Sequence, residues 1–240
     1  MNLHPMQPVR PDFRVDSLLN QMSLTGFQGR KLGESVEVWS RMIQDPGITI
    51  LTGLSGAMIP AGMQECMIAL LENRFIDVLV STGANIFHDI CEHVGVRHYL
   101  GHHMADDEAL FRQGIDRIYD IFAYEEEFRL VDGKIAELAR EHNGFSGSSA
   151  EFVRLLGTWL LKHYPSGRSM TATAARLGIP IFIPALSDSS IGIALVMARR
   201  DGCQVMIDQL ADAEELTKYV ERSQKTGVVY IGGGVPKNFI

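Results

Sequence analysis

Four short segments of the 240-residue sequence combine glycine with small or polar residues. They are residues 53–57, 81–85, 187–190 and 232–234. Glycine lets backbone N–H groups approach a phosphate closely, and a helix that starts just beyond adds the positive end of its dipole. None of the segments is a G-x-G-x-x-G or a G-x-x-x-x-G-K-[ST] motif, so each alone is also typical of a tight turn. Together they predict a site for a dinucleotide or another phosphate ligand.

Asp188 is the carboxylate of most interest in these segments, because it follows an apolar run and precedes an apolar helical pattern. A carboxylate in that place is suited to hold a ribose hydroxyl. It is equally suited to cap the helix, since aspartate before a helix accepts hydrogen bonds from free N–H groups. Both interpretations stay open at this point.

His88 lies three residues beyond the second segment and is a candidate acid–base group, because imidazole titrates near neutral pH. A metal site is the alternative, since Cys91 and His93 follow closely. Further histidines are His98, His102 and His103. On a helix, however, His88 and Cys91 share a face whereas His93 lies well around it, and no fourth ligand follows at a matching spacing. We therefore expect no metal.

The elements that must position these residues alternate between strands and helices. Short apolar runs rich in β-branched residues, typical of strands covered on both faces, occupy residues 48–54, 76–82, 179–185, 203–208 and 227–232. Helical patterns occupy residues 31–44, 60–73, 189–200 and 213–224. This alternation predicts an α/β fold, a Rossmann-like parallel sheet with helices on both faces. The four segments then lie at the carboxyl ends of strands, where such sheets bind ligands.

Residues from about 106 to 163 interrupt the alternation. Two apolar stripes at helical spacing predict helices, and the stretch 142–149 between them predicts a flexible turn. We expect one domain over residues 1–240, with a helical insertion over about 106–163 that covers part of the sheet.

Composition limits the compartment and the partners. The chain is 46% hydrophobic, and its formal net charge of -7 gives no electrostatic reason to bind nucleic acid or an anionic membrane. That charge favours a cationic ligand. Three widely spaced cysteines fit a reducing compartment, and no stretch approaches the roughly 18 apolar residues of a membrane span. We expect a soluble, cytoplasmic protein.

The same segments carry a resemblance to the deoxyhypusine synthase family, in family order and at about family spacing across essentially the whole chain. The matching stretches are TGFQGRKLGESV (25–36), LSGAMIPAGMQE (54–65), DVLVSTGANIFHD (77–89), GIDRIYD (114–120), IPIFIPALSDSSIG (179–192) and VVYIGGGVPKNFI (228–240).

The resemblance implies an NAD-dependent transferase acting on spermidine. In that family NAD oxidises the polyamine to an imine, diaminopropane leaves, and the aminobutyl unit passes through a lysine imine on the enzyme. The acceptor is a lysine of the hypusine-bearing translation factor, or putrescine in homospermidine-forming relatives. The resemblance also implies a homotetramer with NAD and amine at the interface of paired subunits.

Carried onto this sequence, the NAD contacts of the family fall on the four segments. They are Gly56, Ala57, Thr82, Gly83, Ala84, Asp188, Ser190, Gly232, Gly233 and Gly234.

The sequence departs from the family at residues that bear on activity. Phe87 and His88 stand where many members carry a glutamate pair, and Ile193 matches an amine-binding aspartate. Asn238 matches a histidine that acts as base, so it is a candidate catalytic residue by position. A polyamine needs carboxylates to hold its ammonium groups, so a different amine is an alternative substrate.

The C-terminus is the largest departure. In the family the glycine-rich turn leads into a helix, further strands and a segment with the imine-forming lysine, whereas this sequence ends at Ile240. Lys237 matches a family lysine beside the active site, not the imine former. We expect the remainder to be polypeptide that is disordered, cleaved or supplied by another chain. The alternatives are a non-catalytic NAD-binding subunit that needs a partner chain and, last, a generic dehydrogenase, whose G-x-G-x-x-G is absent.

Overall fold

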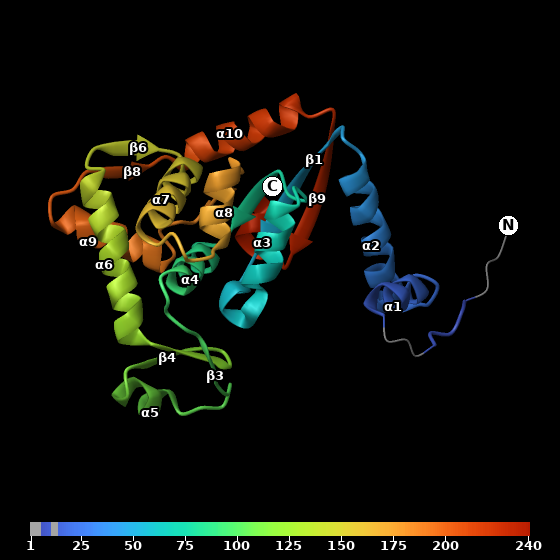
Figure 1. Cartoon of the computed structure of the whole chain (residues 1–240), viewed down its shortest axis with the longest axis horizontal. Coiled ribbons are helices and arrows are strands. Elements are labelled where there is room, and N and C mark those ends of the chain that lie inside the picture. Colours follow the sequence, from blue (N-terminus) through green and yellow to red (C-terminus); the bar gives the residue numbers. More distant parts are fainter. Residues whose placement is uncertain (1–5, 11–13) are drawn as a thin grey trace. The chain divides into compact units, whose positions relative to one another are not determined.

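The computed structural model describes residues 6–10 and 14–240, which form two compact units divided after Ile48 (Figure 1). The first unit contains α1 (Val15–Met22) and α2 (Phe27–Gln44), which pack against each other. A Cβ on Gly33 would lie 2.3 Å from the backbone nitrogen of Ser23, so the helix contact requires glycine. The helix expected from residue 31 begins four residues earlier. The expected single domain over residues 1–240 stays a prediction.

The second unit is built on a four-stranded sheet with the order β7-β2-β1-β9. The strands are β1 (Ile48–Leu54), β2 (Val78–Ser81), β7 (Ile181–Phe182) and β9 (Lys225–Ile231). β1 pairs with β2 in parallel, with Gly53 opposite Val80, and β2 pairs with β7 in parallel, with Leu79 opposite Ile181. Each strand lies on or overlaps an expected apolar run. The α/β class with a parallel sheet is confirmed.

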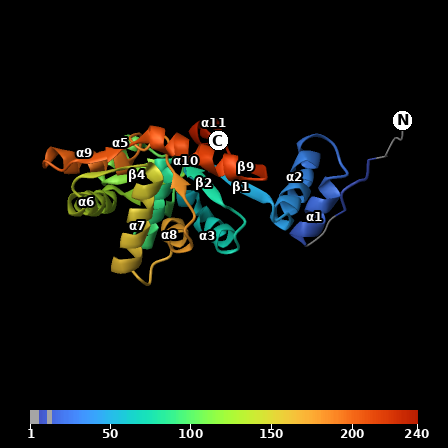
Figure 2. The same ribbon diagram turned by 90° about the horizontal axis from the view of Figure 1, so that it is seen from above.

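Helices lie on both faces of this sheet, as expected: Figure 2 shows α10 and α11 on one side of β1 and β2, and α3 and α8 on the other. The helices that follow the strands of this unit are η1 (Ile59–Met63, a π-helical turn), α3 (Gln64–Glu72), α4 (Gly83–His93), α8 (Met170–Leu177), α9 (Ser190–Arg200), α10 (Gln209–Arg222) and α11 (Gly234–Phe239).

The expected strand at 203–208 belongs to a second sheet. It forms β8 (Val205–Ile207), which pairs in parallel with β6 (Phe145–Gly147). The prediction of a flexible turn over 142–149 was therefore wrong in part, because β6 lies within these residues. The sequence of β6 is Phe-Ser-Gly, which has no apolar run, so only pairing with β8 makes it a strand.

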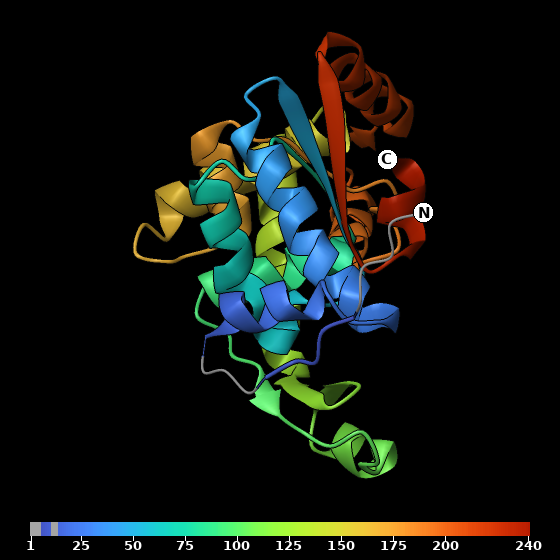
Figure 3. The ribbon, with the colours of Figure 1, turned by 90° about the vertical axis from the view of Figure 1, so that its right-hand side faces the viewer.

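The helical insertion also needs correction. Residues 99–124 form an arm with a three-stranded antiparallel sheet of order β3-β5-β4, which projects from the rest of the second unit (Figures 1 and 3). Its elements are β3 (Tyr99–Leu100), α5 (Asp107–Arg112), β4 (Ile115–Ile118) and β5 (Ile121–Tyr124). The β4–β5 turn has Tyr119 at φ 57, a conformation usually taken by glycine or asparagine, so the usual hairpin pattern is missing from the sequence.

The rest of the insertion is helical, as expected, and consists of α6 (Glu125–Glu141) and α7 (Ser149–His163). α7 begins at a capping box in which Ser148 and Glu151 satisfy each other's backbone N–H groups. Both helices place their apolar stripes in the main hydrophobic core, where Val131, Ile135 and Phe152 are buried beside residues of α3, α4 and α9.

Candidate functional site

The structure brings the four glycine-containing segments together at the carboxyl ends of the central strands. The Thr82 hydroxyl donates a hydrogen bond to the carbonyl oxygen of Gly56 at 2.7 Å, which joins the first two segments. The Ser55 hydroxyl donates to the carbonyl oxygen of Gly233, which joins the first to the last. A Cβ built on Gly83 would lie 2.4 Å from the Ser189 hydroxyl, so the second and third segments are in contact. We call this assembly of the four segments the strand-end cradle.

Two helices of 11 residues each begin at the cradle. α4 starts at Gly83 with Thr82 as its N-cap, whose hydroxyl oxygen accepts a hydrogen bond from the backbone N–H of Asn85 at 3.2 Å. α9 starts at Ser190. The first N–H groups of a helix and the positive end of its dipole favour an anion. The arrangement is therefore suited to phosphate groups.

Asp188 is exposed and does not cap α9. The N-cap of that helix is Ser189, and within residues 6–10 and 14–240 the Asp188 carboxylate has no hydrogen-bond partner. Of the two interpretations of Asp188 from the sequence, the capping one is wrong. The carboxylate is free to bind a ligand hydroxyl.

The last segment turns sharply before α11. Gly232 has φ 88 and Gly234 has φ 61, which glycine adopts without strain. A Cβ on Gly232 would also come within 3.0 Å of the Ser55 Cβ. The turn can therefore pack against the end of β1 only because residue 232 is glycine. Lys237 and Asn238 follow on α11 and are exposed.

Asn85 is a cradle residue that the sequence analysis missed as a functional position. It is fully buried, and its Oδ1 accepts a hydrogen bond from the backbone nitrogen of Ile59 at 3.1 Å. Its Nδ2 donates to the carbonyl oxygens of Leu54 and Ser55 at 3.4 and 3.5 Å. These hydrogen bonds hold the start of α4 against the end of β1. The sequence signal that could have indicated them is an asparagine at the start of an otherwise apolar helix.

Asp89 is a second missed residue, and its role is structural. Its carboxylate accepts hydrogen bonds from the backbone nitrogens of Met170 and Thr171, at 2.8 and 2.7 Å, and from the side chain of Gln64 at 2.9 Å. It thereby anchors the start of α8 to α4. Complete burial, opposed by these hydrogen bonds, raises the pKa of Asp89 to about 6.

His88 lies on α4, but it does not stand open to the crevice as expected. Its ring is packed edge-on against Phe87 and Phe128, and the residue is 7% exposed. The physical reason is that α6 covers this face of α4 with Phe128. Burial, and after it the charge of His98, lower the pKa of His88 to about 3. The imidazole is therefore neutral at physiological pH.

A chain of hydrogen bonds leads from Glu92 to His88. The Glu92 carboxylate lies 2.9 Å from Nδ1 of His98, and Nε2 of His98 lies 2.9 Å from Nδ1 of His88. Because a carboxylate only accepts, His98 carries its proton on Nδ1. When both rings are neutral, His98 accepts at Nε2 and His88 donates from Nδ1. The lone pair of His88 then remains on Nε2, and the lowered pKa of the buried ring keeps this nitrogen unprotonated at neutral pH.

The other metal candidates are separated. Both ring nitrogens of His93 bond within the fold, Nδ1 to the Ser169 hydroxyl at 2.7 Å and Nε2 to the carbonyl oxygen of Tyr164 at 3.0 Å. Cys91 is buried in the main core. In the part of the chain that the structure describes, no three histidine, cysteine, aspartate or glutamate side chains gather as metal ligands.

The family departures differ in their surroundings. Phe87 is buried in the main core, so it contributes packing. Ile193 lies in the first turn of α9 and is 56% exposed. An exposed apolar residue at the cradle is compatible with contact to the hydrocarbon part of a ligand but offers no charge to an ammonium group.

Comparison with known proteins decides the family. The family model for deoxyhypusine synthase matches residues 17–240. The chain belongs to the deoxyhypusine synthase family. "Probable deoxyhypusine synthase 2" of Methanosarcina mazei is 55% identical over 229 residues, which are 95% of this chain and 66% of the relative. The protein of the same name from Archaeoglobus fulgidus is 52% identical, over 91% of this chain and 72% of the relative.

More distant members have related names. A "Deoxyhypusine synthase-like protein" of Chlorobaculum parvum is 37% identical, over 94% of this chain and 65% of its own length. Among solved structures, that of an Entamoeba histolytica protein described as a deoxyhypusine synthase superposes with a TM-score of 0.71 at 19% identity. It covers 92% of this chain and 76% of the other, and at that identity it shows the shared fold alone. The chain spans about two thirds of the length of its first curated relatives.

No helix among the described residues is long and apolar enough to cross a membrane.

Proposed function

We propose that the strand-end cradle binds NAD and that the chain takes part in NAD-dependent aminobutyl transfer from spermidine or a related amine. The observation that carries this proposal is the convergence of the four glycine-containing segments with the starts of α4 and α9. Gly56 leaves the cradle open to a close approach of phosphate, because a Cβ there would meet no atom within 4 Å. Family membership supports the same ligand.

The residues of the cradle fit the parts of a dinucleotide. The N–H groups at Gly83 and Ser190 begin two helices and are suited to the pyrophosphate. Asp188, exposed and without a partner in the described chain, is suited to a ribose hydroxyl. When bound, NAD would supply the hydride acceptor for oxidation of the amine.

His88 is buried beneath Phe128 and its pKa is lowered to about 3, so we do not assign it the acid–base role expected from the sequence. In this chain Asn238 stands at the position of the family base, and an amide is a poor proton acceptor. Asn238 is left with the role of a polar contact to the amine.

The acceptor in this proposal is a lysine of the hypusine-bearing translation factor. Exposed Ile193, where the family has an aspartate, favours a second candidate, in which a small diamine is the acceptor and homospermidine or a related polyamine is the product. All six lysines of the chain are exposed or half-buried, so none lies in the desolvated pocket that an imine-forming lysine needs. Transfer through an enzyme lysine therefore requires one outside this sequence. If none is supplied, the chain acts as an NAD-binding subunit.

The family resemblance also supports a homotetramer. In the arm, Leu100 is 100% exposed and Phe111 is 77% exposed, and apolar side chains on such a projection are suited to contact another copy. The cytoplasm remains the expected compartment.

The test has two stages. Calorimetric titration of the purified chain with NAD asks whether the cradle binds the dinucleotide, with Asp188→Ala as the site variant. Asp120→Ala, exposed in the arm and outside the cradle, is the control. The chain is then incubated with NAD and labelled spermidine, with and without the translation factor or putrescine. Label in protein supports the first candidate, and labelled homospermidine supports the second. NAD binding without any product supports the subunit role, and no NAD binding refutes the proposal.

A further inference from the structure

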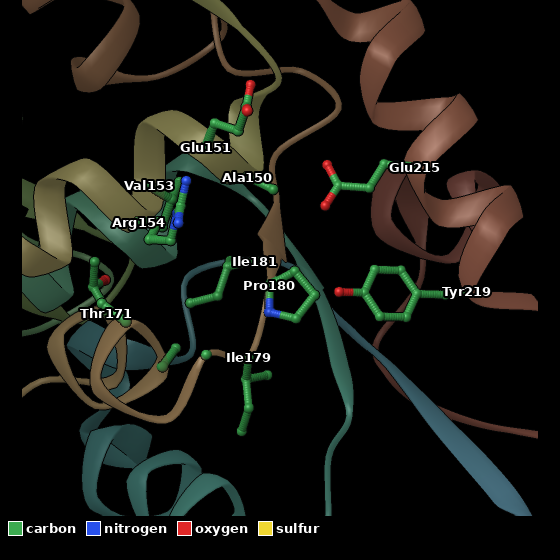
Figure 4. Close-up of a pocket in the computed structure, with 13 residues that line it drawn as sticks. Ala150, Glu151, Val153, Arg154, Thr171, Ile179, Pro180, Ile181, Glu215 and Tyr219 are labelled. Atoms are coloured by element: carbon green, nitrogen blue, oxygen red, sulfur yellow. The ribbon is translucent and has the colours of Figure 1, made fainter. Parts of the chain in front are cut away.

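A cavity of about 320 Å³ lies between α7, α8, α10 and the residues that enter β7 (Figure 4). Its apolar wall comes from Ala174, Ile179, Pro180 and Ile181. This wall belongs to residues that precede and begin β7, whereas the cradle segment 187–190 follows that strand. None of the residues that line the cavity belongs to the cradle segments, so the cavity is a separate site.

The cavity has charged side chains on opposite sides. Figure 4 shows Arg154 of α7 on one side and Glu215 and Tyr219 of α10 on the other. In the described part of the chain, neither Arg154 nor Glu215 has an ion-pair partner, and Glu215 accepts a hydrogen bond from the Ser148 hydroxyl at 3.2 Å. Glu151 of α7 also lines the cavity, but its carboxylate accepts a hydrogen bond from the backbone N–H of Ser148 in the capping box. Arg154 and Glu215 are therefore the two opposite charges that are available to a ligand.

Two further polar residues, Thr171 and Tyr219, line the cavity. Thr171 is fully buried. Tyr219 is half-buried beside Glu215, and burial followed by that carboxylate raises the pKa of its phenol. The phenol is therefore protonated at neutral pH and can donate a hydrogen bond.

We propose that this cavity binds a small ω-amino acid, with the ligand carboxylate at Arg154 and the ligand ammonium at Glu215. The methylene groups between them would cover Ile179, Pro180 and Ile181, whose apolar surface a hydrated ion would not use. An amine alone would leave Arg154 without a partner, and a carboxylate alone would leave Glu215 without one. Neither half of the ligand should therefore bind as tightly as the whole. This inference does not depend on NAD binding at the cradle.

The experiment is an NMR titration of the whole chain with 4-aminobutyrate and with 6-aminohexanoate. The chain is labelled with 13C at the isoleucine δ1 methyl groups, and the chemical shifts of these methyl groups are measured. Ile179 and Ile181 report on the cavity, and Ile193 of α9, which does not line it, is the internal control. Butylamine and butyrate are titrated in parallel as the two halves of the ligand. Arg154→Gln and Glu215→Gln are the site variants. Glu214→Gln, next to Glu215 on α10 but outside the cavity, is the control.

We expect saturable shifts of Ile179 and Ile181 with at least one of the two amino acids, weakened tenfold or more by each site variant and less than twofold by Glu214→Gln. Both site variants change polar groups on helix surfaces, and circular dichroism checks that they fold. Three results would overturn the proposal. These are no saturable shift with either amino acid, equal affinity for butylamine or butyrate, and affinity that neither site variant changes.

Discussion

The contact between Gly83 and Ser189 gives the most direct test of how the cradle is assembled. A Cβ at residue 83 would lie 2.4 Å from Ser189 Oγ and 2.5 Å from Ser189 Cβ, whereas the next neighbour, Cγ2 of Ile183, is at an ordinary 3.6 Å. The hydroxyl can rotate away, but the Ser189 Cβ is fixed to the backbone. Gly83→Ala must therefore push the starts of α4 and α9 apart.

The size of the effect follows from two opposed contributions. Overpacking at a well-packed contact costs about 1–3 kcal/mol, and exchanging glycine for alanine in a helix returns up to about 1 kcal/mol. We expect Gly83→Ala to lower the free energy of unfolding by about 1–2 kcal/mol. NAD affinity should fall as well, because the cradle widens.

The partner substitution isolates the cause. Ser189→Gly loses the hydrogen bond from the Ser189 hydroxyl to the Leu186 carbonyl oxygen, at a cost of about 1 kcal/mol, but it makes room for a Cβ at residue 83. In that background Gly83→Ala should cost nothing, which gives an interaction energy of about 1–2 kcal/mol in the double-mutant cycle. Gly133→Ala is the control, since a Cβ there meets no atom within 4 Å, and it should stabilise α6 by about 0.5–1 kcal/mol.

Urea denaturation followed by circular dichroism measures all four variants. The reasoning is refuted if Gly83→Ala is as stable as the parent. It is equally refuted if the substitution costs the same with serine or glycine at residue 189.

Three further predictions concern the ligand site and the buried His88. Asp188→Ala should weaken NAD binding by about 1–3 kcal/mol, the scale of a hydrogen bond to a charged group, and unchanged affinity in calorimetry would remove Asp188 from the site. His88 is neutral in the fold down to about pH 3 but takes up a proton below about pH 6.5 when unfolded, so stability should fall on acidification, by up to about 1.4 kcal/mol per pH unit. His88→Gln should flatten the slope of unfolding free energy against pH between 6.5 and 4.5, and equal slopes would contradict the burial argument. Ile193→Asp, at an exposed position, should tighten spermidine binding without loss of stability, and an unchanged dissociation constant would show that α9 does not face the amine.

One strand and one hairpin of the structure could not be predicted from the local sequence. β6 is Phe-Ser-Gly and becomes a strand by pairing with β8, and the β4–β5 hairpin turns through Tyr119 without glycine or asparagine in the turn. In both cases the local sequence has no preference strong enough to predict the element. Pairing with β8, which is distant in sequence, makes β6 a strand. A positive φ tolerated at Tyr119 allows the β4–β5 turn.

What the sequence determined by itself is the place along the chain of the four central strands and of the glycine-containing segments that follow them. Both follow from local properties, namely apolar runs of strand length and the freedom of glycine at their ends. The family resemblance comes from the same residues. Only the tertiary structure decided that Ser189 rather than Asp188 occupies the N-cap position of α9, which leaves the Asp188 carboxylate without a partner in the described chain. It also decided that His88 is buried beneath Phe128 and joined to Glu92 through His98. Those outcomes depend on which helix packs against which face of its neighbours. The spacing of residues within one segment does not predict such tertiary contacts.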